Sequence, residues 1–137
     1  MENYVLDRYR IVFDKEATSD WYQKYKGWDC SCADCQNFLT MVRKGKLPGA
    51  VTQMLQTFGL PADKPTYICK LYSSGESQLY QFNYRVAGKI LNGPAPCEAV
   101  NFFRGSAMFG YDPYPWRAPG FPAPCFDLML YVYLPLS

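Results

Sequence analysis

The sequence predicts an α+β fold: a single domain over residues 1–137, with a twisted antiparallel sheet of about five strands and two or three helices inserted after the first strand. Polar and apolar residues alternate near the N-terminus and again through the second half of the chain, which is the pattern of half-buried strands. Between these regions, two segments repeat apolar residues at helical spacing. Segregated helices and strands are typical of α+β domains, and 137 residues without an internal repeat suit one domain.

The N-terminal residues predict the first strand and a short helix. Residues 7–14 alternate so that three apolar side chains share one face. Residues 15–27 follow as a short helix or an irregular segment, which Gly27 ends. The apolar face of the strand carries Tyr9, Ile11 and Phe13. The candidate N-caps of the helix are Thr18, Ser19 and Asp20.

Two amphipathic helices are predicted next, joined by a short connection. The first covers residues 33–44, and Gly45 suits its end. The second begins after Pro48 and ends at Gly59. Both carry apolar residues at i, i+3, i+4 and i+7, so we expect these stripes to face the core. The stripes are Cys35, Phe38, Leu39 and Val42 in the first helix, and Val51, Met54, Leu55 and Phe58 in the second.

The second half of the chain predicts four strands. They cover residues 66–73, 78–91, 100–110 and 125–136, and a bulge is expected at Gly105 in the third. Turns are expected over residues 74–77 and 92–99. The inward-facing residues of the two longest strands are Tyr80, Phe82, Tyr84, Val86, Ile90, Phe126, Leu128, Leu130, Val132 and Leu134. The polar residues Gln81, Asn83, Arg85 and Lys89 are expected on the other face.

Composition excludes several classes of function. The net charge of +2 gives no argument for binding nucleic acid or an anionic membrane. No stretch approaches the ~20 apolar residues of a membrane span, and the first residues carry charge without an apolar leader. We therefore expect a cytoplasmic protein. In a reducing compartment its six cysteines serve as free thiols, metal ligands or redox groups more often than as disulfides.

No catalytic residue is assigned from the sequence. Histidine is absent, which removes the common triads and most hydrolase metal sites. Neither of the glycine-rich phosphate-binding motifs is present, and the carboxylates are scattered. A binding role is therefore favoured over an enzymatic one.

Three cysteines in six residues, Cys30, Cys32 and Cys35, allow three interpretations. The first is packing, because cysteine behaves as a small apolar residue and Cys35 lies on the helix stripe. The second is a structural zinc ion, which requires four ligands; the candidates for the fourth are Asp29, Asp34, Cys69, Cys97 and Cys125. The third is a redox pair in "CADC" at a helix N-terminus, where the dipole lowers a thiol pKa. The spacing is only half of a zinc-binding motif, so all three interpretations stay open. Packing is favoured over a metal site, and a metal site over a redox pair.

The pattern W-x-C-x-C-x2-C-x-N-F over residues 28–38 resembles that of a family of small, functionally uncharacterised bacterial proteins. The resemblance extends to "FGLPADKP", "YRVAGKI" and the end of the chain. It implies one intact domain and no particular activity. The family pattern carries Tyr-His where this chain has Tyr84-Arg85, so the resemblance implies no histidine-dependent site here.

Residues 111–124 hold five prolines and are predicted to form a stiff loop outside the sheet. The loop carries residue types that are enriched at binding hot spots. The candidate binding residues are Tyr111, Tyr114, Trp116, Arg117 and Phe121. The alternative is that these rings cap the end of the sheet.

These observations favour a small intracellular binding or protein-interaction domain with a protein or small-molecule partner, and with one structural zinc ion as an option. One alternative is a thiol-dependent redox protein that uses Cys30, Cys32 and Cys35. A further alternative is a phage-type inhibitor of a host protein.

Overall fold

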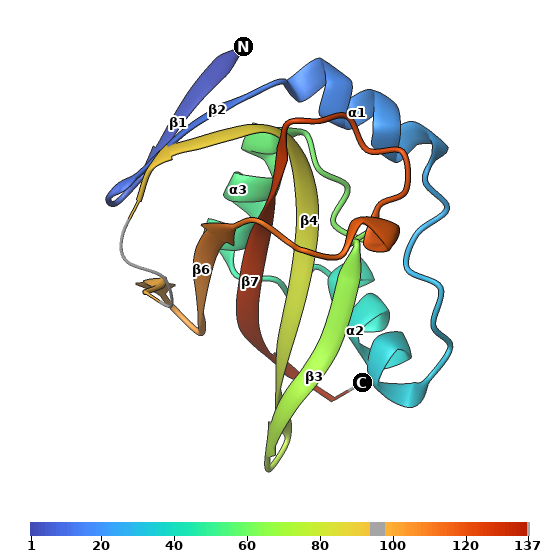
Figure 1. Ribbon diagram of the computed structural model, residues 1–137. Coiled ribbons are helices and arrows are strands. Elements are labelled where there is room, and N and C mark those ends of the chain that lie inside the picture. The colour runs from blue at the N-terminus through green and yellow to red at the C-terminus, as the bar shows by residue number, and fades with distance from the viewer. Residues whose placement is uncertain (94–97, 137) are drawn as a thin grey trace.

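The computed structural model describes residues 1–93 and 98–136 (Figure 1). Within these residues, three α-helices and a seven-stranded sheet form an α+β fold. In chain order the elements are β1 (Glu2–Leu6), β2 (Tyr9–Phe13), α1 (Lys15–Lys24), α2 (Ala33–Arg43), α3 (Gly49–Phe58), β3 (Tyr67–Ser74), β4 (Ser77–Asn92), β5 (Val100–Phe102), β6 (Gly105–Gly110), a short 3-10 turn η1 (Pro115–Arg117) and β7 (Cys125–Pro135).

The long strand β4 organises the antiparallel sheet. It pairs with β7 on one side. On its other side, its first half pairs with β3 and its last residues pair with β2, and Figure 1 shows its curvature. Apart from β3, which pairs only with β4, the strands lie in the order β1-β2-β4-β7-β6-β5. Gly88 allows β2 to approach, because a Cβ on this residue would lie 2.2 Å from the carbonyl oxygen of Val12.

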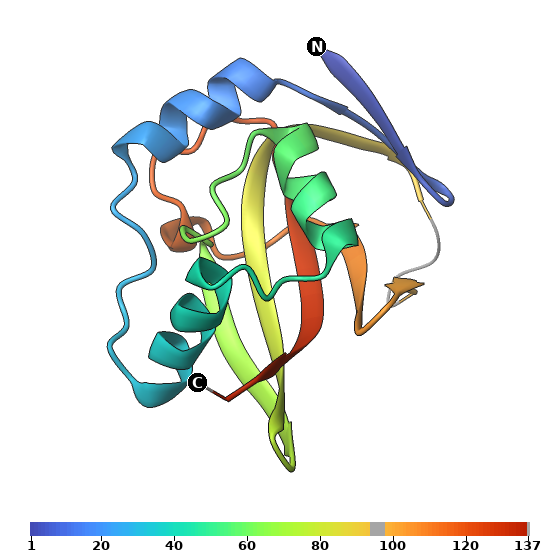
Figure 2. The same ribbon diagram turned by 180° about the vertical axis from the view of Figure 1, so that it is seen from behind.

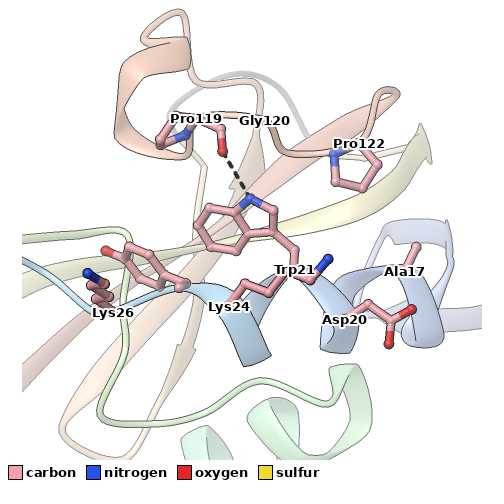
Figure 3. A pocket seen from close by; sticks show the side chains of 9 residues that line it. Ala17, Asp20, Trp21, Lys24, Lys26, Pro119, Gly120 and Pro122 are labelled. Atoms are coloured by element: carbon pink, nitrogen blue, oxygen red, sulfur yellow. Dashed lines mark hydrogen bonds between the residues drawn. The ribbon is translucent and has the colours of Figure 1, made fainter.

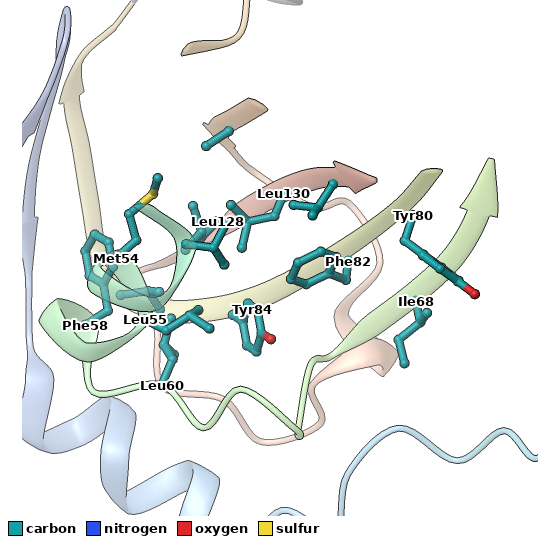
Figure 4. Close-up of a cluster of buried hydrophobic side chains, with 14 of the residues drawn as sticks. Met54, Leu55, Phe58, Leu60, Ile68, Tyr80, Phe82, Tyr84, Leu128 and Leu130 are labelled. Carbon is teal, nitrogen blue, oxygen red and sulfur yellow. The ribbon is translucent and has the colours of Figure 1, made fainter. Parts of the chain in front are cut away.

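Helices α2 and α3 cover one face of the sheet, as seen from behind in Figure 2, and α1 lies across its end. The core fills the space between these helices and strands β4 and β7 (Figure 4). The ring centroids of Phe38 and Phe82 lie 4.7 Å apart. The stripe of α3 is confirmed in full, and in α2 only Val42 is less than fully buried. All the inward-facing residues predicted for β4 and β7 are buried except Ile90, which is half-buried.

Polar contacts fix α1 on the sheet. The hydroxyl of Tyr22 donates to the carbonyl oxygen of Arg85 at 2.8 Å, and the amide of Ala87 donates to the Thr18 hydroxyl at 3.0 Å. The N-cap of α1 is Asp14, whose carboxylate accepts from the amide of Ala17 at 3.0 Å. The predicted caps Thr18, Ser19 and Asp20 were wrong, because the helix begins earlier and contains them.

The predicted number of strands was too small, since β1 was not predicted and one predicted strand is a hairpin. The strand predicted over residues 7–14 is β2, which pairs with β1 around a turn at Asp7 (φ +51°). The helices therefore follow the second strand. Likewise, residues 100–110 form β5 and β6 around Arg104 (φ +67°), not one strand with a bulge. The turn predicted over residues 92–99 lies partly outside the described residues.

The second face of the sheet is partly covered by residues 111–124, which cross it in Figure 1. Beneath this loop, the Arg85 guanidinium donates from Nε to Asp127 at 2.9 Å and from Nη2 to Asp112 at 2.7 Å. The Arg85 and Asp112 side chains are each 5% exposed and the Asp127 side chain is 1% exposed. Asn83 also donates to Asp127, at 3.3 Å. Asn83 and Arg85 were predicted on the face opposite the inward-facing residues, and this part of that face is buried because the loop brings Asp112 over Arg85.

Burial sets the ionisation of this cluster. It raises the pKa of Asp127 to about 6, against the opposing effects of the hydrogen bond and charge of Arg85. Burial also opposes the charge on Arg85, but the hydrogen bond with Asp127 and the neighbouring carboxylates raise the pKa of the guanidinium above its usual value. The protein therefore keeps a charged arginine beside a carboxyl group that titrates close to neutrality.

We expect the Asp127 carboxyl to make the protein more stable as the pH falls from about 7.5 to about 5. Between the unfolded pKa of about 4 and the folded pKa of about 6, the folded state holds a proton that the unfolded state lacks. This contribution is complete below the unfolded pKa and is lost as the pH rises through the folded pKa. In urea unfolding, the free energy of unfolding of the native protein should rise by on the order of 1 kcal/mol between about pH 7.5 and about pH 5, and Asp127→Asn should lack this rise. Identical pH dependence in both proteins would refute the assignment.

Candidate metal centre

The cysteine cluster lies where an irregular segment enters α2. After α1, Gly27 adopts a φ of +104°, and the amide of Cys30 donates to the carbonyl of Trp28 at 3.2 Å. Cys32 is the N-cap of α2, and its sulfur accepts from the amide of Cys35 at 3.4 Å. A sulfur atom at this position faces the unpaired amides of the first helical turn. The spacing C-x2-C therefore places two sulfurs at the positive end of the helix.

The sulfur atoms of Cys30, Cys32 and Cys35 all lie within 4.8 Å of one another. Their exposure is graded: Cys32 is exposed, Cys30 is half-buried, and Cys35 is buried against the core. Two thiolates bound to one tetrahedral zinc ion, with Zn–S bonds of about 2.3 Å, lie roughly 3.8 Å apart. Small side-chain rotations would therefore bring the three sulfurs onto one ion.

The surroundings affect these thiols in opposite ways. The amide of Cys35, followed by the thiols of Cys30 and Cys35, lowers the pKa of Cys32. Burial, followed by the other two thiols, raises the pKa of Cys35 to about 12, and the Trp28 indole N–H lowers it. Cys35 is thus a neutral thiol near neutrality unless a cation replaces its proton. The cluster has the thiols and the helix dipole to hold a cation, since metal binding displaces thiol protons.

A fourth protein ligand is not part of the cluster in the described residues. Two predicted candidates, Asp29 and Asp34, each lie one residue from a cysteine of the cluster. Asp29 is exposed, and the half-exposed carboxylate of Asp34 pairs with the ammonium group of Lys70 at 3.6 Å. Cys69 donates from its sulfur to the Lys70 carbonyl oxygen. Cys125 follows the proline-rich loop. Burial raises the pKa of its thiol, and the positive charge of Arg85 opposes this increase. Cys97 lies outside the described residues.

The proline-rich loop places the predicted binding residues in two groups. Tyr111, Tyr114 and Trp116 are exposed, at 62%, 42% and 67%. Arg117 is half-buried and stacks between Tyr67 and Tyr114, with its guanidinium carbon 4.0 Å and 4.5 Å from the two ring centroids. It also pairs with the Asp112 carboxylate at 3.4 Å.

The other predicted binding residue, Phe121, packs on α1. Its ring centroid lies 4.9 Å from that of Trp21. Trp21 in turn donates from its indole N–H to the carbonyl of Pro119 at 3.1 Å (Figure 3). These contacts fasten the end of the loop to α1.

Two neighbouring pockets lie beside this loop, the larger against α1 and the smaller against the segment after it. The larger, of about 760 Å³, surrounds Trp21 and is drawn in Figure 3. The smaller, of about 390 Å³, contains both Trp28 and Trp116. They share Tyr25 and Pro119. The remaining lining residues of the smaller pocket are Gly27, Asp29, Tyr67 and Arg117.

Sequence reasoning singled out the three cysteines that the structure brings together, but it assigned no role to Trp28 or Lys70. Trp28 belongs to the same short motif as the cysteines. Lys70 gave no such signal, because its contact with Asp34 joins a strand to a helix far apart in the sequence.

Comparison with known proteins gives no relative for this chain. No family model matches it, and no curated protein or solved structure shows significant similarity to it. The resemblance of residues 28–38 to a bacterial motif therefore adds no family membership. Within the described residues, no helix has the length and apolar character needed to cross a membrane.

Proposed function

We propose that the protein is a small binding domain that holds one thiophilic metal ion, with zinc as the first candidate, at Cys30, Cys32 and Cys35. The observation that carries this proposal is the convergence of three sulfurs within 4.8 Å at a helix N-terminus. Thiolates are the ligands that zinc and other soft ions prefer. Water or the Asp34 carboxylate completes the coordination. Coordination by Asp34 requires its ion pair with Lys70 to break.

The role of the ion is structural. It joins the irregular segment containing Trp28 and Cys30 to the first turn of α2, at the edge of the core, where both residues are partly buried. We expect chelation to loosen residues 25–35 and to leave the sheet folded. Faster amide exchange limited to this segment would show this effect, whereas global unfolding would mean that the whole fold depends on the ion.

Metal binding is tested by titrating the reduced protein with Co²⁺ and Zn²⁺. We expect one ion per chain, a thiolate-to-cobalt charge-transfer band, and protection of three of the six cysteines from a thiol reagent. Cys32→Ser should weaken binding by at least tenfold. Cys69→Ser is the matched control, because Cys69 is a partly buried cysteine outside the cluster. Failure of the native protein to bind either ion would end the proposal.

A thiol redox role is the second candidate, and one observation favours it. Cys32 is exposed and Cys35 is buried three residues later, the arrangement of an attacking thiol and a resolving thiol at a helix N-terminus. Reversible formation of a disulfide between these two residues in a glutathione redox buffer, together with weak metal binding, would favour the redox function over the metal centre.

The partner-binding surface is proposed to be the exposed part of the proline-rich loop, centred on Trp116 and including Arg117. Its rings project from a backbone that is stiffened by proline and held by the ion pair between Arg117 and Asp112. A preorganised aromatic surface loses little conformational entropy when it binds a protein or a small molecule. The cytoplasmic location and the phage-type inhibitor role remain expectations from the sequence.

Trp116→Ala should change the free energy of unfolding by no more than about 0.5 kcal/mol, as at other exposed positions, because its side chain is 67% exposed. It should abolish the binding of ligands found by screening peptide and small-molecule libraries against the native protein. Phe103→Ala is the control, since Phe103 is an exposed ring outside the loop. Strong destabilisation with retained binding would identify Trp116 as a cap on the sheet.

A further inference from the structure

The cysteine cluster offers an ion three protein ligands and no fourth within the residues that the structure describes. The chain contains no histidine. Of the two carboxylates next to the cluster, that of Asp34 pairs with the Lys70 ammonium group at 3.6 Å, and Asp29 is exposed. Zinc takes four ligands in a structural site, so it needs water or a displaced carboxylate here. An ion that requires three sulfur ligands and no more fits the cluster without either.

The burial of the cluster favours a bound ion that leaves no net charge. Cys35 is 5% exposed and belongs to the hydrophobic core, and Cys30 packs against that core. Three thiolates with Zn²⁺ carry one negative charge, whereas three thiolates with a trivalent ion carry none. An unpaired charge is costly in an apolar environment, and the Lys70 ammonium group is already balanced by Asp34.

Gln36 fixes the relative position of the segments that carry the sulfurs. Its backbone amide donates to the carbonyl oxygen of Cys32 at 3.0 Å, and its side-chain amide donates to the carbonyl oxygen of Cys30 at 3.4 Å. The irregular segment is therefore tied to the first turn of α2. A set of ligands that is already in place loses little conformational entropy when it binds.

We propose that Cys30, Cys32 and Cys35 bind trivalent arsenic, supplied as arsenite, in preference to zinc. The proposal rests on the three-sulfur centre proposed above and names a further ligand for it. Trivalent arsenic forms a trigonal pyramid with three sulfurs, and its lone pair occupies the fourth position. Its bonds to sulfur are about as long as Zn–S bonds, about 2.3 Å. Sulfur atoms within 4.8 Å of one another therefore reach one arsenic atom through small side-chain rotations.

The binding reaction is a condensation that needs no oxidant. Arsenite is As(OH)₃ near neutral pH, and each thiol replaces one hydroxyl group. In each replacement an S–H bond and an As–O bond break, an As–S bond forms, and the proton leaves with the hydroxyl group as water. Arsenic stays trivalent. The exposed Cys32 gives arsenite its first contact, and the two following replacements are intramolecular, which favours them.

The test is titration of the reduced protein with arsenite. We expect one arsenic atom per chain, a mass gain of one arsenic atom less three hydrogen atoms, and protection of three of the six cysteines from a thiol reagent. Phenylarsine oxide, whose arsenic can bind only two thiols, should protect two. Arsenite should also abolish the thiolate-to-cobalt band of the Co²⁺-loaded protein.

Cys32→Ser tests the third sulfur at an exposed position where serine also serves as an N-cap. It should weaken arsenite binding by roughly 100-fold, since one of three linked attachments is lost, and it should still bind phenylarsine oxide. Cys69→Ser, outside the cluster, should bind arsenite as the native protein does.

The possible results separate this proposal from the metal centre. Equal arsenite affinity in Cys32→Ser and the native protein, or a cobalt band that survives excess arsenite, would overturn the arsenite site and leave the metal centre intact. Binding of arsenite without binding of Co²⁺ or Zn²⁺ would support the arsenite site and reject the metal function. A native protein that binds none of the three would reject both.

Discussion

Arg85→Ala is expected to destabilise the protein by about 3–5 kcal/mol, the usual cost of removing one partner of a buried ion pair. Arg85 forms ion pairs with both Asp112 and Asp127. Its loss leaves two buried carboxylates without the positive charge that they share. Since Asp112 belongs to the proline-rich loop, the substitution should also detach that loop from the sheet. Urea unfolding at neutral pH gives the free energy, and limited proteolysis between residues 111 and 124 reports the loop.

The matched control for Arg85→Ala is Arg8→Ala. Arg8 pairs with Glu98 at the surface, where the two side chains are 64% and 50% exposed. A surface pair contributes about 0–1 kcal/mol, so this variant should be nearly neutral. If Arg85→Ala were as mild as Arg8→Ala, the buried network would not be what fastens the loop.

Phe58→Ala should cost about 3–5 kcal/mol, the range for removing a buried aromatic side chain from a core. Phe58 is completely buried at the end of α3. Its ring centroid lies 4.7 Å from that of Phe13 in β2 and 4.9 Å from that of Tyr4 in β1. The cavity would therefore open between a helix and the N-terminal hairpin, two parts that cannot easily move together because both are held by the sheet.

The measurement for Phe58→Ala is again urea unfolding, with Phe103→Ala as the control. Phe103 is 81% exposed, so its truncation should remain within about 0.5 kcal/mol. Phe58→Leu should fall between these values, because it restores part of the lost volume. A loss below 1 kcal/mol in Phe58→Ala would show that the N-terminal hairpin does not pack on α3.

The helices were predictable because their signals are local. The stripe of α3 recurs every three or four residues, and Gly59, at a φ of +72°, supplies the left-handed residue that ends it. The long strands β4 and β7 were predictable for the same reason, since alternation over many residues specifies a face. The cysteine cluster is also local, because three sulfurs within six residues at a helix start cannot lie far apart.

The short strands were not predictable from their own residues. β1 and β5 are brief segments at opposite edges of the sheet. They exist because a neighbouring strand offers a row of hydrogen bonds, which is a property of the neighbour. The turns that create them place Asp7 and Arg104 at positive φ, and arginine gives no sequence signal for that conformation.

The sequence by itself determined which segments form helices and long strands, which side chains enter the core, and which three sulfurs meet. Only the tertiary structure decided that Asn83, Arg85 and Asp127 are buried, and that the indole nitrogen of Trp28 is buried without a hydrogen-bond partner. The physical reason is the distance along the chain over which each effect acts. Periodicity and capping act over a few residues, whereas a buried charge needs a partner that the fold delivers from a distant part of the chain, as the proline-rich loop delivers Asp112 to Arg85.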